Sequence, residues 1–63
     1  SAGDYARASV YYQAIVTKGS LAHLMDIYDY QIQGQNFFAA VNSRMSWTPE
    51  RLEQEVRKYL GIN

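Results

Sequence analysis

Residues 20–45 read SLAHLMDIYDYQIQGQNFFAAVNSRM, and this central stretch decides the fold. Its first part repeats large apolar side chains at the spacing i, i+3, i+4, i+7 and i+11, which places them along one face of a helix. These side chains are Leu21, Leu24, Met25, Tyr28 and Ile32. The pattern predicts an amphipathic helix that turns this face towards the core of the protein.

Gly34 interrupts the same stretch. A glycine inside a helix costs about 1 kcal/mol relative to alanine, so a helix is expected to stop there. Asn36 can cap a new helix directly afterwards. We therefore expect a short second helix that turns Phe37, Phe38, Val41 and Met45 inwards; one long bent helix over residues 21–45 is the alternative.

A helix over residues 5–18 is expected before the central stretch. Asp4, or Ser1 together with Asp4, can cap its amino end. Apolar side chains at helical spacing give it an inward face. They are Tyr5, Ala8, Tyr12, Ile15 and Val16. Gly19 follows, and we expect it to end the helix in the left-handed conformation.

A helix over residues 49–60 is the best-marked element of the sequence. Thr48 is a good N-cap, and the proline that follows it fits the first helical position. Trp47 before the cap and Leu52 inside the helix match a hydrophobic staple. Gly61 should end the helix in a Schellman motif.

The sum is a single all-α domain over residues 1–63, a compact bundle of three helices, or of four if the middle helix breaks near Gly34. The chain begins with Ser and not with Met, so we expect residues 1–3 to be disordered or a remnant of cloning. The predicted core consists of Tyr12, Ile15, Leu21, Leu24, Tyr28, Ile32, Phe38, Val41, Leu52, Val56 and Leu60.

Composition and charge argue against several classes of protein. The chain has no cysteine, which excludes a small domain held together by disulfides. No apolar run approaches the roughly 20 residues that cross a bilayer, and no signal-peptide pattern opens the chain. We therefore expect a soluble protein without a membrane partner, and we favour the cytoplasm.

The residues that could carry catalysis are few. His23 and Asp26 are helical neighbours at i, i+3, with Ser20 nearby, and this pair could in principle orient an imidazole as a general base. A domain of this size rarely encloses a pocket that excludes water, and the chain has no cysteine and no glycine-rich phosphate loop. We expect no catalytic residue, no metal site and no cofactor.

Tyrosine gives the clearest hint of a function. The chain has six tyrosines, more than a core this small needs, and tyrosine is enriched at protein interfaces. Tyr30 projects from the side of the central helix opposite to its apolar face. We predict that Tyr30, Asp26, Asp29 and Gln33 form a patch that binds another protein or a second copy of the chain.

A helical DNA-binding regulator is the alternative. It would contact phosphates through the last helix, with Arg44, Arg51, Arg57 and Lys58. The formal net charge of +0 disfavours this function, because proteins that grip a phosphate backbone usually carry a basic excess. These cations also have acidic neighbours at helical spacing, since Arg51 and Lys58 can pair with Glu55, and Arg57 with Glu53.

Overall fold

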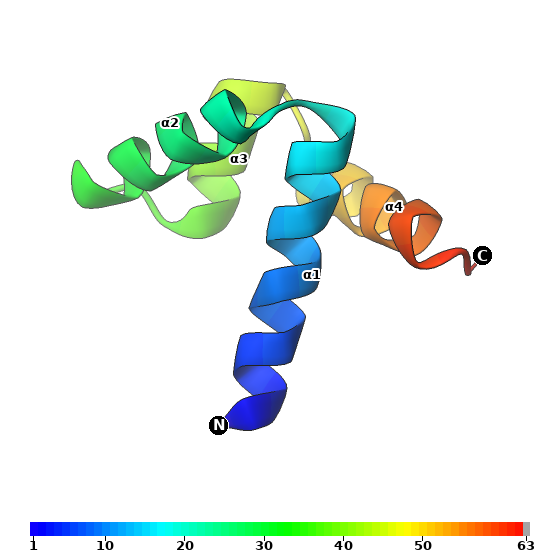
Figure 1. Cartoon of the computed structure of the whole chain (residues 1–63). Coiled ribbons are helices and arrows are strands. Elements are labelled where there is room, and N and C mark those ends of the chain that lie inside the picture. The colour runs from blue at the N-terminus through cyan, green and yellow to red at the C-terminus, as the bar shows by residue number, and fades with distance from the viewer. Residues whose placement is uncertain (63) are drawn as a thin grey trace.

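The computed structural model describes residues 1–62, and within them it contains four α-helices and no strand (Figure 1). The all-helical prediction is confirmed, and the middle stretch forms two helices. In chain order the helices are α1 (Ala2–Lys18), α2 (Leu21–Ile32), α3 (Phe37–Met45) and α4 (Pro49–Leu60). The first helix begins three residues earlier than the sequence predicted, with Ser1 at its N-cap and Ala2 already helical.

The break at Gly34 is a Schellman motif. Gly34 has a φ of 111°, a conformation that glycine adopts without strain. Its N–H donates to the carbonyl of Gln31 at 3.0 Å, and the N–H of Gln35 donates to the carbonyl of Tyr30 at 3.0 Å. These two bonds satisfy the last carbonyls of α2 and turn the chain back.

Side-chain caps begin the three helices that follow. The side-chain oxygens of Ser20, Asn36 and Thr48 accept hydrogen bonds from the backbone N–H three residues later, at 3.2, 2.8 and 3.1 Å. The carboxyl end of α4 closes at Gly61, whose φ is 74°. Each of these boundaries had been predicted from local sequence signals.

Gly19 is required for a different reason from the one predicted. Its φ is −107°, so the expected left-handed conformation is wrong. A Cβ atom at this position would lie 3.0 Å from Cε of Met45 and 3.1 Å from both Cγ of His23 and the carbonyl oxygen of Ile15. Glycine therefore allows the turn between α1 and α2 to pack closely against the end of α3.

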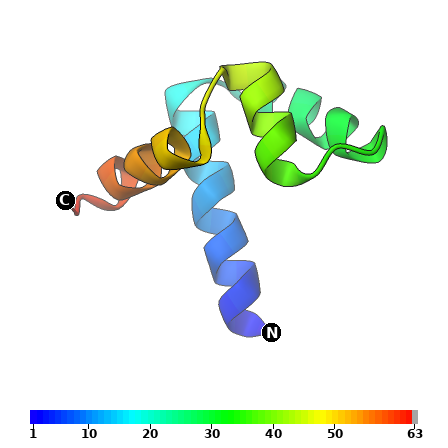
Figure 2. The ribbon, with the colours of Figure 1, turned by 180° about the vertical axis from the view of Figure 1, so that it is seen from behind.

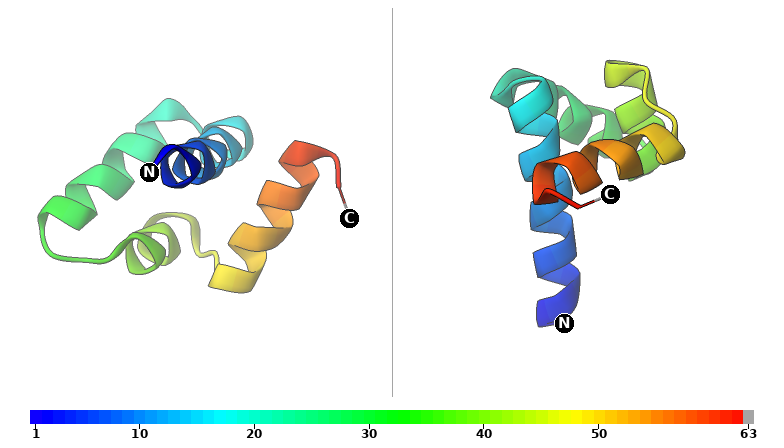
Figure 3. Two further views of the ribbon diagram at one scale, coloured as in Figure 1. Left: turned by 90° about the horizontal axis from the view of Figure 1, so that it is seen from below. Right: turned by 90° about the vertical axis from the view of Figure 1, so that its right-hand side faces the viewer.

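The helices are arranged in two pairs. α2 packs against α3 as a hairpin, and α4 packs against the second half of α1, which also contacts α2. The views in Figure 3 show α2 and α4 at opposite edges, with α1 between them. The first half of α1 projects away from the other helices (Figures 1 and 2), and residues 1–7 are exposed.

The core lies where these four helices meet. Its buried apolar members are Ala14, Ile15, Leu24, Ile27, Ala40, Val41, Trp47, Leu52 and Val56. Trp47 and Leu52, the expected staple, are both buried, and the side-chain amide of Asn42 donates to the carbonyl of Trp47 at 3.2 Å. This bond fixes the short turn between α3 and α4.

The predicted core is wrong at five positions. Leu21, Tyr28, Ile32, Phe38 and Leu60 are all exposed. On α2 the physical reason is that α1 and α3 contact the face that carries Leu24 and Ile27, which is rotated by about 100° from the centre of the predicted apolar stripe.

On α1 and α3, too, the buried side chains differ from the predicted ones. Tyr5, expected to face inwards, is 80% exposed, because it lies in the projecting half of α1. On α3 the small side chain of Ala40 is fully buried beside Val41, while Phe37 and Met45 pack at the edge of the core. The small side chains of Ala14 and Ala40 are buried, whereas Phe38, which had been expected to face inwards, is 48% exposed.

Candidate protein-binding surface

Four large apolar side chains form an exposed row along α2. They are Leu21, Met25, Tyr28 and Ile32, with exposed fractions of 61%, 59%, 43% and 83%. Their spacing of four, three and four residues keeps them on one face over the whole length of the helix. We call this row the α2 stripe.

The α2 stripe is exposed because α2 lies at an edge of the molecule. Its neighbours α1 and α3 lie on one side of it, and the other side is open, as Figure 3 shows. The buried face of α2 is formed by Leu24 and Ile27, and of the stripe only Tyr28 also has a ring contact with α1. The stripe is therefore free to contact another molecule.

Aromatic contacts hold one member of the stripe in position. The ring of Tyr28 lies 5.7 Å from that of Tyr12 on α1, and Tyr12 in turn contacts Phe37 on α3 edge-on at 6.0 Å. Partial burial raises the pKa of the Tyr28 hydroxyl, and the nearby Tyr12 hydroxyl adds to this effect. Tyr28 consequently stays neutral and offers a fixed ring with a polar tip.

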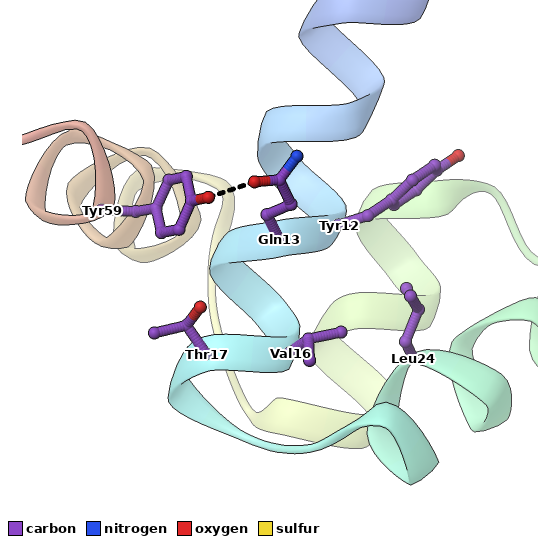
Figure 4. Close-up of a pocket in the computed structure, with 6 residues that line it drawn as sticks. All are labelled: Tyr12, Gln13, Val16, Thr17, Leu24 and Tyr59. Atoms are coloured by element: carbon purple, nitrogen blue, oxygen red, sulfur yellow. Dashed lines mark hydrogen bonds between the residues drawn. The ribbon is translucent and has the colours of Figure 1, made fainter.

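A shallow groove of about 310 Å³ adjoins the stripe (Figure 4). It is lined by Tyr12, Gln13, Val16, Thr17, Leu24 and Tyr59, and none of these six side chains is charged. The hydroxyl of Tyr59 donates to Oε1 of Gln13, which ties α4 to α1 at one end of the groove. Tyr12 lines the groove and its ring contacts that of Tyr28, so the groove lies next to this member of the stripe.

Of the patch predicted from the sequence, Asp29 lies beside the stripe and Tyr30 lies on the opposite side of α2, with Asp26 and Gln33 between them. The four residues are not equally available. Asp29 and Gln33 are exposed, whereas Tyr30 is half-buried and packs against the core. Asp26 accepts a hydrogen bond from Nε of Arg44 at 2.8 Å, which links α2 to α3.

The apolar spacing of α2 predicted that the stripe faces the core, but the stripe is exposed. Apolar residues have the same spacing on a helix face that is buried in the core and on a helix face that binds a partner. What the sequence did not reveal is that the buried residues of α2 are Leu24 and Ile27.

The buried carboxylate of Glu55 organises the cations of α4. Its oxygens lie 3.0 Å from Nε of Arg51, 3.7 Å from Nζ of Lys58 and 3.9 Å from Nζ of Lys18. Burial alone would raise the pKa of this carboxyl, but the hydrogen bond from Arg51 and the positive charges around it lower it below its ordinary value. Glu55 is therefore ionised and its cations are partly neutralised.

The cations proposed to contact phosphate all lie next to carboxylates. Arg57 pairs with Glu53 at 3.8 Å, Arg44 with Asp26, and Arg51 and Lys58 with Glu55, so the pairings expected on α4 are confirmed. The guanidinium of Arg51 also lies 5.7 Å from the centre of the Trp47 ring. A phosphate backbone would have to compete with these partners.

His23 and Asp26 do not contact each other as a catalytic pair would. Nδ1 of His23 lies 2.7 Å from the hydroxyl oxygen of Ser20, while Asp26 pairs with Arg44. Among residues 1–62, no three His, Cys, Asp or Glu side chains gather as they would around a metal ion. Over the same residues, no helix has both the length and the apolar character needed to cross a membrane.

Comparison of the chain with models of protein families, with curated proteins and with solved structures finds no match. The surface of α2 therefore has to be interpreted from its own geometry.

Proposed function

We propose that this domain is a non-enzymatic protein-binding module and that the α2 stripe is its binding surface. The observation that carries the proposal is the exposure of four large apolar side chains along one face of a helix that is already anchored by its other face. Exposure of apolar side chains to water costs free energy, so exposed apolar patches of this kind are often functional.

The size of the stripe fits a binding role. The exposed areas of its four side chains sum to on the order of 400 Å², which is in the range of the largest apolar patch on a typical monomer. Covering about 400 Å² of apolar surface contributes roughly 10 kcal/mol before costs. Association itself costs about 4–15 kcal/mol, so the expected complex is of weak to moderate affinity.

The form of the stripe favours a helical partner. A narrow apolar row that follows one helix face is the surface on which a second amphipathic helix packs. The uncharged groove beside it would accept further apolar side chains of that partner. The acidic neighbour Asp29 lies at the edge of the stripe and would remain in water or meet a cation.

Site-specific photo-cross-linking in the cell that makes the protein tests this proposal. A photoreactive amino acid replaces Met25 in the stripe, and in a matched variant it replaces Gln54, which is exposed on α4. We expect a discrete adduct from position 25 and none from position 54. The adduct should disappear when Ile32→Lys is added and persist when Ile62→Lys is added, since Ile62 is exposed outside the stripe.

Two outcomes would contradict the proposal. Equal adducts from positions 25 and 54 would mean that the stripe has no special affinity for proteins. Absence of any adduct at position 25 would mean that it is left uncovered. Far-UV circular dichroism of each variant shows that the helices are retained.

A further inference from the structure

We infer that the partner of the α2 stripe is a cationic amphipathic helix, in which lysine or arginine side chains flank the apolar row and meet Asp29. This inference rests on the proposed function and names the chemistry of the partner. Three observations support it: the distribution of charge along the chain, the position of Asp29 on α2, and the carboxyl end of this helix.

Charge is unevenly distributed along the chain. Between Gly19 and Ser43 the charged side chains are Asp26 and Asp29, both acidic. The six lysines and arginines all lie outside this segment, so α2 itself contains none. A partner that covers α2 therefore meets carboxylates and no cation of this helix.

Asp29 is the available one of these two carboxylates. Asp26 accepts a hydrogen bond from Nε of Arg44 at 2.8 Å. Asp29 is exposed, and none of the ion pairs among residues 1–62 includes it. It follows Met25 by four residues and precedes Ile32 by three, so it lies beside both on the surface of the helix. A cation that flanks the apolar row of a partner can therefore reach Asp29 while the row covers the stripe.

The carboxyl end of α2 lacks the cation that each of the other three helices has. Basic side chains lie in the last turns of α1, α3 and α4, where they offset the negative end of the helix dipole. They are Lys18, Arg44, Arg57 and Lys58. The last turn of α2 has no basic residue, and Asp29 adds a negative charge there. A cation supplied by the partner would offset both the dipole and the carboxylate.

The same charges disfavour other occupants of the stripe. An acidic helix or an anionic membrane would bring negative charge towards Asp29 and be repelled. A neutral apolar helix would remove part of the hydration of Asp29 and leave it without a partner. A cation beside the apolar row pairs with Asp29 instead, and such an exposed pair changes the affinity by up to about fivefold. Apolar contact therefore provides most of the affinity, and charge selects the partner.

Synthetic helical peptides of about 18 residues test the chemistry of the partner. Three peptides share one row of leucines at helical spacing and carry lysine, glutamine or glutamate at the positions that flank the row. Calorimetric titration at low salt should rank their affinities in that order, with about a tenfold difference between the lysine and glutamate peptides. Raising the salt concentration should narrow this difference. A lysine peptide that does not bind, or a glutamate peptide that binds as tightly, would overturn the inference.

Reversing the charge of Asp29 shows whether this carboxylate selects the partner. The Asp29→Lys chain should bind the glutamate peptide more tightly than the lysine peptide, which reverses the wild-type order. Glu50→Lys is the matched control, because it makes the same change in net charge at an exposed carboxylate of α4. The control should keep the wild-type order. Equal effects of the two substitutions would mean that only net charge matters and would overturn the inference.

The photo-cross-linking experiment separates this inference from the proposed function. Adding Asp29→Lys should reduce the yield of the adduct at position 25 by about tenfold, whereas adding Glu50→Lys should leave the yield unchanged. An adduct that persists undiminished with Asp29→Lys overturns the cationic partner and leaves the binding role intact. No adduct at position 25 without these substitutions overturns both.

Discussion

Glu55 is the residue whose environment has the clearest measurable consequence. It is the one buried charged side chain among residues 1–62, and three cations from α1 and α4 surround it. A buried carboxylate is costly unless it is paired, and here the pairing with Arg51, Lys58 and Lys18 offsets that cost. The contact joins the first and last helices of the chain.

Replacing Glu55 by glutamine should destabilise the protein by about 1–3 kcal/mol at neutral pH, because the amide cannot balance the three cations. Urea unfolding measures the difference. Glu53→Gln is the matched control, since Glu53 forms an exposed pair with Arg57 and should cost less than about 0.5 kcal/mol.

The pH dependence of this difference follows from the lowered pKa of Glu55. A carboxyl whose pKa is lower in the folded state stabilises the fold fully above its unfolded pKa, about 4.3. The stabilisation is lost as the pH falls through the lower folded pKa. The wild-type and Glu55→Gln unfolding energies should therefore converge in acid; a constant difference down to pH 2 would contradict the assigned role.

Ser46 offers a stabilising substitution. It ends α3 with a φ of 59°, the left-handed conformation, which costs about 1 kcal/mol for a residue other than glycine. Ser46→Gly should raise the free energy of unfolding by roughly 0.5–1 kcal/mol. The same change at Ser43, inside α3, should lower it; thermal or urea unfolding shows whether the two signs differ.

At the scale of the element, α2 carries two apolar faces, and only the one with Leu24 and Ile27 is buried. Ile27 is 1% exposed, while Ile32, five residues further along, is 83% exposed. Both are isoleucines in the same helix, so they form a matched pair for mutation. Their contrast separates the face that holds the domain together from the face proposed to bind.

Ile27→Ala should destabilise the isolated chain by about 2–4 kcal/mol, because it leaves a cavity in the core. Ile32→Ala should change the stability by less than about 0.5 kcal/mol when measured at low protein concentration. Urea unfolding of the two variants makes the comparison. The reverse order would mean that the predicted apolar face, and not the observed one, is buried.

At the scale of the whole molecule, balanced charge limits what the domain can attract. The formal net charge is +0, and the four cations once assigned to phosphate contacts lie beside acidic partners. Counterion release therefore provides little free energy for binding a polyanion. Apolar contact through α2 is the interaction that this surface favours.

Labelled duplex DNA titrated at two salt concentrations checks this conclusion. We expect no saturable binding at low salt, and no loss of signal on raising the salt. Tight binding at low salt that weakens steeply at higher salt would instead support the DNA-binding alternative, with α4 as the contact. Arg57→Ala and Lys58→Ala would then reduce the affinity in all sequences alike.

Local signals in the sequence indicated helices and most of their ends, with a break at Gly34 as one of two alternatives and the start of α1 placed three residues too late. The signals at Ser20, Gly34, Asn36 and Thr48 act within four residues of the chain, through caps and backbone conformations that need no distant partner. For the same reason, the staple of α4 and the ion pairs along this helix could be predicted. Gly19 was recognised as a helix end, but its role in close packing depends on Met45, 26 residues away.

Only the tertiary structure decided which face of each helix is buried. Leu24 belongs to both apolar faces of α2, and the presence of α1 and α3 on one side selects Ile27 as its buried companion over Tyr28 and Ile32. Apolar spacing places side chains on a common face of a helix, but burial depends on neighbours that are distant in the chain. The exposed stripe, and with it the candidate binding surface, follows from that choice.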